Sequence, residues 1–265
     1  MRAAFSKAEI ESEIASRFSV AFRLPEKAPT ELMSTGVPAI DSLAGGLPRG
    51  AITEIFGPAS SGRTSLMLSI LASATTHQEV CALIDTNDVF DPTIAAEAGV
   101  EPEQLLWVRC AANIEHAFKA ADLLLQGGGF GLVIIDIGDV PSRDAQRIIS
   151  SWWYRFRRTV ESTPTVFMVI AQKPCVRSCA SLTLEMNHGV DMWVATGNTS
   201  FKKSGKEVFS SPNSVFNYLS SVTPPTPNPT HSNLLVNMQL LVERQKPFSS
   251  GEIKAHFRAQ ASYSL

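Results

Sequence analysis

A glycine-containing stretch at residues 57–64, Gly-Pro-Ala-Ser-Ser-Gly-Arg-Thr, sets the strongest limit on the fold of this chain. It matches the phosphate-binding pattern G-x-x-x-x-G-K-[ST] at every fixed position except the lysine, which is replaced by Arg63. Residues 51–56 before it read as a short buried strand. The apolar residues after it recur at helical spacing, at Leu66, Met67, Ile70 and Leu71. A strand, a glycine loop and a helix in this order predict a phosphate cradle.

The residue types of the loop suit the phosphates of a nucleotide. Gly57 and Gly62 allow the backbone to curl so that successive N–H groups point inward, and the helix adds the positive end of its dipole. Arg63 keeps the positive charge of the missing lysine, but its planar fork is bulkier and favours bidentate contacts. We expect the phosphate contacts at Gly57, Ser60, Ser61, Gly62, Arg63, Thr64 and Ser65. A glycine turn that binds no ligand is the alternative.

An acid at the end of a later strand completes the predicted site. Residues 132–136 are four apolar residues followed by Asp136, which lies at the expected distance downstream of a phosphate loop. Open parallel sheets bind ligands at the carboxyl ends of their strands. We therefore expect Asp136 and the Thr64 hydroxyl around a Mg²⁺ ion. Residues 81–84 and 165–171 read as further buried strands, and 182–186 as another.

Composition limits the remaining choices. The 265 residues are enough for one large α/β domain, and the net charge of −2 gives no overall basic field for nucleic acid. The sequence contains no apolar run of the ~20 residues that a bilayer span needs, nor an apolar signal segment at its start. We expect a soluble cytoplasmic protein with no membrane contact. Cys175 and Cys179 lack two further ligands nearby, which favours ordinary thiols over zinc ligands.

The parts outside the core are predicted in less detail. In residues 1–33, a capping box at Ser6 and apolar residues at four-residue spacing indicate an amphipathic helix and a linker. This helix either folds back on its own core or docks on a neighbouring subunit, which would make a homo-oligomer. Residues 187–230 read as a mobile insertion with a hairpin around 190–195, because they are rich in glycine, serine and proline. Residues 231–260 return to strand character.

One predicted helix, over residues 143–160, has two contrasting faces. Its apolar and aromatic residues fill one arc, which we expect to pack on the sheet. The opposite face carries Arg147, Arg155 and Arg158. These arginines are either solvated surface or a contact for a partner or a phosphate backbone.

Several segments together resemble the RecA family. They are the approach to the loop at residues 34–50, then 83–92, 98–100 and 105–108. The resemblance covers roughly residues 34–186 and implies an α/β fold with a mostly parallel, twisted sheet flanked by helices. It also implies ATP and Mg²⁺ as ligands. By the same resemblance, Asp91 bonds the adenine amino group and Gln172, after the strand at 165–171, senses the terminal phosphate.

The departures from the family pattern concern catalysis and DNA contact. Asn87 stands where the family has the acid that activates water, and an amide cannot accept a proton. Asp88 is adjacent, but side chains alternate faces in extended chain, so we expect it to point elsewhere. Ile94 replaces a tyrosine that stacks on the base. We expect both DNA-binding loops of the family to be lost, and also the C-terminal domain of bacterial RecA.

This pattern of losses is similar to the ImuA group, RecA-like accessory proteins of bacterial damage-induced mutagenesis. The resemblance implies a protein of translesion synthesis and the SOS response that binds ATP, hydrolyses it weakly or not at all, and acts through RecA or mutagenesis polymerase proteins. Because Asn87 replaces the acid, we predict no catalytic residue in this sequence. One alternative is an active DNA-dependent ATPase or recombinase in which Asp88 is the base. Another is a SulA-like cell-division inhibitor, against which the nearly complete phosphate loop counts.

Overall fold

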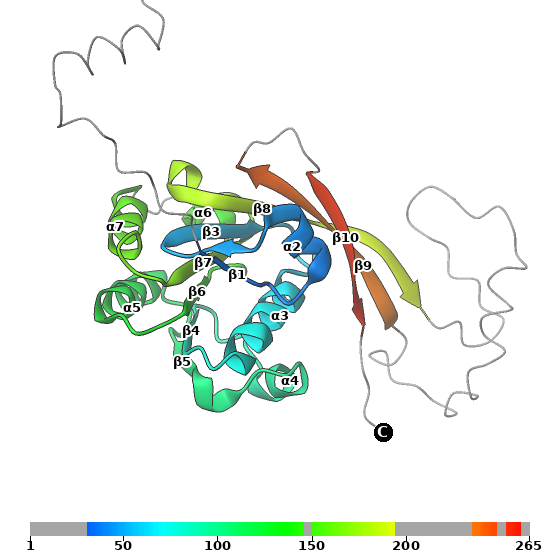
Figure 1. The fold of residues 1–265 in the computed structure, drawn as a ribbon, viewed down its shortest axis with the longest axis horizontal. Coiled ribbons are helices and arrows are strands. Elements are labelled where there is room, and N and C mark those ends of the chain that lie inside the picture. The colour runs from blue at the N-terminus through cyan, green and yellow to red at the C-terminus, as the bar shows by residue number, and fades with distance from the viewer. Residues whose placement is uncertain (1–30, 146–149, 194–234, 248–252, 261–265) are drawn as a thin grey trace, which may run out of the picture. The chain divides into compact units, whose positions relative to one another are not determined.

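The computed structural model describes residues 31–145, 150–193, 235–247 and 253–260. These residues form an eight-stranded sheet with helices on both faces (Figure 1). The strand order is β10-β9-β8-β3-β7-β6-β4-β5. The strands are β3 (Ala51–Phe56), β4 (Cys81–Asp85), β5 (Leu105–Arg109), β6 (Leu132–Asp136), β7 (Val166–Ala171), β8 (Ala180–Trp193), β9 (Leu235–Lys246) and β10 (Lys254–Gln260).

Most of this sheet is parallel. The strands from β8 to β5 in the sheet order run parallel to one another, and β9 and β10 are antiparallel to their neighbours. The predicted α/β class with a mostly parallel sheet is therefore confirmed. A small second sheet pairs β1 (Leu32–Met33) with β2 (Leu47–Pro48).

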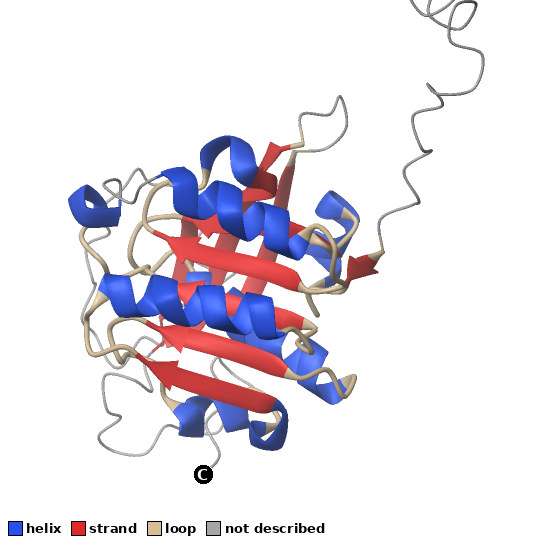
Figure 2. Cartoon of the chain, turned by 90° about the vertical axis from the view of Figure 1, so that its left-hand side faces the viewer, coloured by secondary structure: helices blue, strands red, loops and turns tan. Residues whose placement is uncertain are grey.

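The helices divide into two layers because the strands are buried on both sides. α5 (Ile114–Gly127) and α7 (Ser150–Val160) cover one face, in front of the strands in Figure 2. α2 (Pro38–Ala44), α3 (Arg63–Thr76) and α4 (Pro92–Glu97) lie on the other face. The short elements are η1 (Pro102–Gln104), α6 (Ser142–Ala145) and η2 (Arg177–Cys179). Alternate strand residues therefore enter different cores: Ile52 belongs to the first and Ile55 to the second.

The register of the central strands brings four connections to one edge of the sheet. Phe56 in β3 is opposite Ala171 in β7, Ile170 is opposite Asp136 in β6, and Asp136 is opposite Asp85 in β4. Since all four strands are parallel and end together, the loops that follow them are neighbours. This edge is where open parallel sheets bind ligands.

Two expectations about the elements need correction. The strand expected at 182–186 is β8, which runs from Ala180 to Trp193, so no hairpin forms at residues 190–193. Its pairing with β9 continues to Trp193 opposite Leu235, and this long-range pairing has no local sequence signal. Residues 105–108, which carry part of the family resemblance, lie in an edge strand, β5, that the sequence patterns do not predict. The predicted N-terminal helix lies outside the described residues.

The helix expected at 143–160 is described as α6 and α7, and Arg147 lies outside the described residues. The aromatic face packs as predicted: Trp153 and Phe156 are buried and contact Phe118 of α5. On the other face, Arg155 forms a 2.6 Å ion pair with Asp122. The helix therefore uses its apolar arc for the core, as its periodicity predicts.

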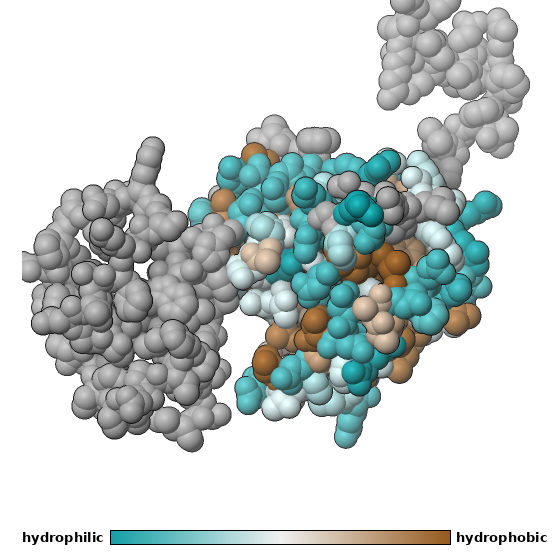
Figure 3. Space-filling view, turned by 180° about the vertical axis from the view of Figure 1, so that it is seen from behind, coloured by the Kyte–Doolittle hydropathy of each residue, from teal (hydrophilic) through white to brown (hydrophobic). Residues whose placement is uncertain are grey.

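The surface of the protein points to a binding site less clearly than the carboxyl-end edge of the sheet does. Hydrophilic side chains cover most of the described surface seen from behind, with smaller hydrophobic patches between them (Figure 3). Exposed apolar side chains include Val89, Ile94 and Leu106. None of the helices that the structure describes has the length and apolar character of a membrane span.

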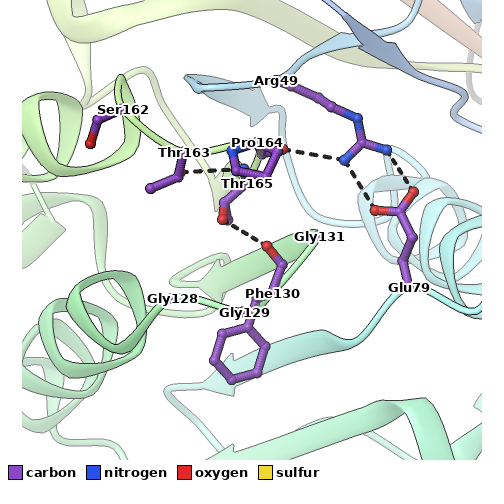
Figure 4. Close-up of a pocket in the computed structure, with 10 residues that line it drawn as sticks. All are labelled: Arg49, Glu79, Gly128, Gly129, Phe130, Gly131, Ser162, Thr163, Pro164 and Thr165. Atoms are coloured by element: carbon purple, nitrogen blue, oxygen red, sulfur yellow. Dashed lines mark hydrogen bonds and ion pairs between the residues drawn. The ribbon is translucent and has the colours of Figure 1, made fainter.

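A cavity of about 340 Å³ lies at the opposite edge, where the central strands begin. Its principal polar contact joins Arg49, before β3, to Glu79, before β4, with nitrogen to oxygen distances of 2.6 and 3.0 Å (Figure 4). Arg49 also donates to the carbonyl of Pro164, before β7, at 3.2 Å. The arginine thus ties together three connections that are far apart in sequence. We interpret this cavity as structural.

The Arg49 to Glu79 pair should contribute measurably to stability. Its side chains are only 19% and 24% exposed, and bidentate charge-assisted contacts are stronger than exposed ion pairs. We expect Arg49→Ala to lower the free energy of unfolding in urea by about 1–3 kcal/mol. Arg157→Ala, which removes the exposed pair with Glu161, is the control and should cost about 0.3–0.5 kcal/mol. Equal losses in the two variants would contradict the structural role.

Candidate functional site

The glycine loop joins β3 to α3 in the predicted way. Gly62 ends it with φ +87°, and a Cβ atom there would collide with the side chain of Leu240 in β9. A Cβ atom on Gly57 would collide with the carbonyl oxygen of Met186 in β8. Glycine is therefore required at both positions, because of the left-handed backbone at one and the close neighbours at both. The loop lies at the N-terminus of α3, whose dipole favours an anion.

Arg63 is the first residue of α3, and its side chain turns into the protein. It is 8% exposed, and Nη1 donates to the carbonyl oxygen of Gly138 at 3.2 Å. Gly138 follows the end of β6, where its own N–H donates to Asp136 Oδ1 at 2.7 Å. The register of β3, β7 and β6 thus places the guanidinium beside the predicted metal-binding acid.

The electrostatics of Asp136 follow from these surroundings. Burial raises its pKa to about 6, against the lowering effects of the Gly138 N–H and of Arg63. The nearby Asp139 and Asp85 raise it further. Negative charge is therefore concentrated at this strand end, and the guanidinium of Arg63 partly compensates it.

The Arg63 guanidinium competes with a Mg²⁺ ion for the space beside Asp136. Mg²⁺ requires near-octahedral oxygen ligands, but Asp136 Oδ1 is already bonded to a backbone N–H and a guanidinium lies beside it. Thr64 is exposed. By contrast, the Ser61 hydroxyl is buried in the loop without a hydrogen-bond partner among the described residues. The Mg²⁺ site predicted at Thr64 and Asp136 fits these contacts poorly.

The loop after β4 holds the residues that depart from the family pattern. Asp85 is buried and accepts the N–H groups of Val89 (3.1 Å) and Phe90 (2.9 Å), which closes a turn around Asn87. The Asn87 Oδ1 atom is buried and has no partner among the described residues. An amide thus occupies the position where the family resemblance places the catalytic acid.

Asp88 is directed toward β5, and it lies in a bend with a left-handed backbone (φ 58°) instead of the extended chain on which the alternation argument depends. Its carboxylate pairs with Arg109 at the end of β5 (3.2 Å) and accepts the N–H of Ala111 at 3.4 Å. In the sheet order β5 lies beyond β4, whereas the glycine loop lies on the side of β3. The ion pair therefore holds Asp88 on the side away from the loop.

The other two predicted residues occupy different places. Gln172 directly follows β7 and is half-buried beside the start of the glycine loop, whose Gly57 N–H donates to Ala171. Asp91 lies farther along the edge, where it caps α4: its Oδ1 accepts from Thr93 (2.8 Å) and Ile94 (3.3 Å). The structure thus brings Gln172, the loop and Asp136 together, with Asp91 to one side of them.

Glu54, in the middle of β3, is a functional candidate that the sequence patterns do not reveal. It is 1% exposed, and its Oε1 accepts the N–H groups of Cys175 (2.6 Å) and Val176 (2.9 Å). These contacts hold the connection between β7 and β8. The only sequence signal is an acid within an apolar strand. Glu54 also lines a cavity of about 410 Å³ together with Arg177, Glu185 and Lys246.

The two cysteines of the same connection are buried free thiols. Burial raises the pKa of Cys175, and the neighbouring Glu54 raises it further. The described residues offer no metal cluster around them.

Together the fold and the loop define a P-loop α/β protein, in which a glycine loop and the first turn of a helix face the carboxyl ends of parallel strands. The model of the RecA N-terminal domain family matches residues 5–143, just over half of the chain. The chain therefore belongs to the RecA family, as the sequence resemblance predicts. It is also 42% identical to Protein RecA of Leifsonia xyli subsp. xyli over 113 residues, which are 42% of this chain. The match spans 31% of that relative.

Replacing Glu54 should change how stability depends on pH. Burial raises the pKa of Glu54 above 4.5, although the two N–H groups and Lys246 lower it. The unfolded chain releases this proton first, so the free energy of unfolding falls as pH rises from 4.5 through the raised pKa. Glutamine keeps an acceptor oxygen but does not ionise.

We therefore expect the stability of Glu54→Gln relative to wild type to increase over that pH range, by at most about 1.4 kcal/mol per pH unit. Urea unfolding at several pH values measures this difference. Glu103→Gln, at an exposed glutamate, controls for the loss of one charge. Identical pH profiles for Glu54→Gln and wild type would contradict the buried-acid account.

The two roles of Asp91 can be separated. Both capping bonds use Oδ1, so the cap does not require Oδ2. Asp91→Ala should lower the free energy of unfolding by about 1 kcal/mol, and Asp91→Ser should preserve it because serine is also a good cap. If the carboxylate also bonds adenine, Asp91→Ser should weaken ATP binding about tenfold at unchanged stability. Calorimetric titration measures the affinity, and an unchanged affinity would leave Asp91 with the capping role alone.

Proposed function

We propose that this RecA-family protein binds ATP in its glycine loop, hydrolyses it weakly or not at all, and acts through protein partners in the response to DNA damage. The observation that carries the proposal is the pairing of an intact phosphate cradle with an amide, Asn87, in the position of the catalytic acid. The role is that of an ImuA-like accessory of translesion synthesis in the SOS response.

Nucleotide binding is supported by the geometry of the loop. Gly57 and Gly62 are fixed by their close neighbours, and α3 directs its N-terminal N–H groups toward the loop. Arg63 adds a positive charge that can contact phosphate oxygens in bidentate fashion. Gln172 lies next to the loop, where it can respond to the terminal phosphate.

Weak hydrolysis follows from the proton chemistry. A positioned general base contributes typically ~10²–10⁴ to a rate, and an amide cannot take the proton of the attacking water. Asp88, the nearest carboxylate in sequence, is held by Arg109 and Ala111 beyond β4. An active ATPase would require Asp88 to leave both partners.

Action through proteins is supported by the short connections at the ligand edge. Residues 137–141 join β6 to α6, and residues 172–179 join β7 to β8. The second connection is tied to Glu54 and is not free to extend. We propose RecA or mutagenesis polymerase proteins as partners, with DNA contact weak or indirect. Arg155, on the predicted basic face, is already paired with Asp122.

Single-turnover hydrolysis with and without single-stranded DNA tests the proposal. The wild-type rate should stay below ~1% of that of a RecA-type ATPase, and Asn87→Glu should raise it at least ~10-fold by supplying a base. Asp88→Ala should leave the rate unchanged. Brisk wild-type hydrolysis, abolished by Asp88→Ala, would overturn the proposal in favour of an active ATPase.

A further inference from the structure

Arg63 and Gly138 form a matched pair at the end of β6. The guanidinium donates to the Gly138 carbonyl oxygen at 3.2 Å and is almost fully buried. A Cβ atom at residue 138 would lie 2.7 Å from Arg63 Nη1 and 2.9 Å from Asp136 Oδ1. Any side chain at this position would therefore push the guanidinium away from the acid.

The backbone conformation does not explain why residue 138 is a glycine. Gly138 lacks the positive φ that makes Gly62 obligatory, so other residues could adopt its conformation. The remaining explanation is steric, because a side chain at 138 would need the space beside Asp136 that Arg63 fills. A glycine at 138 thus accommodates an arginine at 63.

The charges around Asp136 also favour a cation beside this acid. Asp136, Asp139 and Asp85 concentrate negative charge at these strand ends. In a metal-dependent phosphate loop a divalent cation compensates such charge and bridges the phosphates. Here the guanidinium of Arg63 lies beside Asp136 and donates to the neighbouring Gly138 carbonyl oxygen.

We propose that the loop binds a nucleoside triphosphate without a divalent cation, with Arg63 in the place of the metal as the bridge between Asp136 and the phosphates. This inference rests on the proposed nucleotide binding and names its ionic requirement. Mg²⁺ needs several oxygens at 2.0–2.1 Å in octahedral geometry, whereas a guanidinium bonds phosphate oxygens directly.

Calorimetric titration of ATP into the full chain, with excess EDTA or with excess MgCl₂, tests this. Wild type should bind with dissociation constants that agree within about twofold in the two buffers, which is a difference of under 0.5 kcal/mol. Arg63→Lys should bind at least ~10-fold more weakly in EDTA than in MgCl₂, because a compact ammonium leaves room for the metal and does not bridge.

Gly138→Ala provides a second test through the neighbour of the arginine. It should weaken binding in EDTA at least ~10-fold while binding in MgCl₂ changes less, because the methyl group displaces the guanidinium and not the loop. Gly127→Ala is the matched control, since its Cβ would meet nothing within 4 Å. Thermal unfolding verifies that each variant is folded.

The outcomes separate the two claims. Wild-type binding that requires MgCl₂ would overturn the metal-independent bridge and leave the proposed nucleotide binding intact. An absence of binding in both buffers would overturn both. Equal affinities of Gly138→Ala and wild type in EDTA would also contradict the role of Arg63.

Discussion

The contact between Arg63 and the strand end at Asp136 depends on the parallel pairing of β3, β7 and β6. This pairing places the residue after the glycine loop within hydrogen-bond distance of Gly138, which lies 75 positions later in the chain. If either pairing shifted by one residue, the side chains would alternate to the other face and the contact would be lost. The site is therefore a property of the sheet register as much as of the loop sequence.

The strands at the other side of the sheet complete the loop. Leu240 of β9 packs against Gly62, and the backbone of β8 passes close to Gly57 at Met186. Glu54 adds a third tie, from β3 to the connection after β7. The cradle is thus enclosed on several sides by segments distant in sequence. Such preorganisation lowers the conformational cost of binding an anion.

Local sequence patterns predict the parts of the site that depend on local chemistry. The glycine loop, α3 and the acid at the end of β6 follow from glycine spacing, helical periodicity and an apolar run. The length of β8, the edge strand β5 and the capping role of Asp91 do not, because they arise from pairing between distant strands and from loop geometry. The direction of the Arg63 side chain is likewise not predictable from local sequence patterns. Its identity is visible in the sequence, but its contact with Gly138 requires the folded sheet.

The proposed function depends on a nucleotide pocket that keeps its phosphate cradle and lacks a water-activating acid. A crystal structure of the full chain with a non-hydrolysable ATP analogue tests it most directly. We expect the phosphates on the backbone amides of residues 60–65, the Arg63 guanidinium on a phosphate oxygen, and no carboxylate positioned to activate a water at the terminal phosphate. A carboxylate such as Asp88 in that position, or an analogue bound away from the loop, would contradict it.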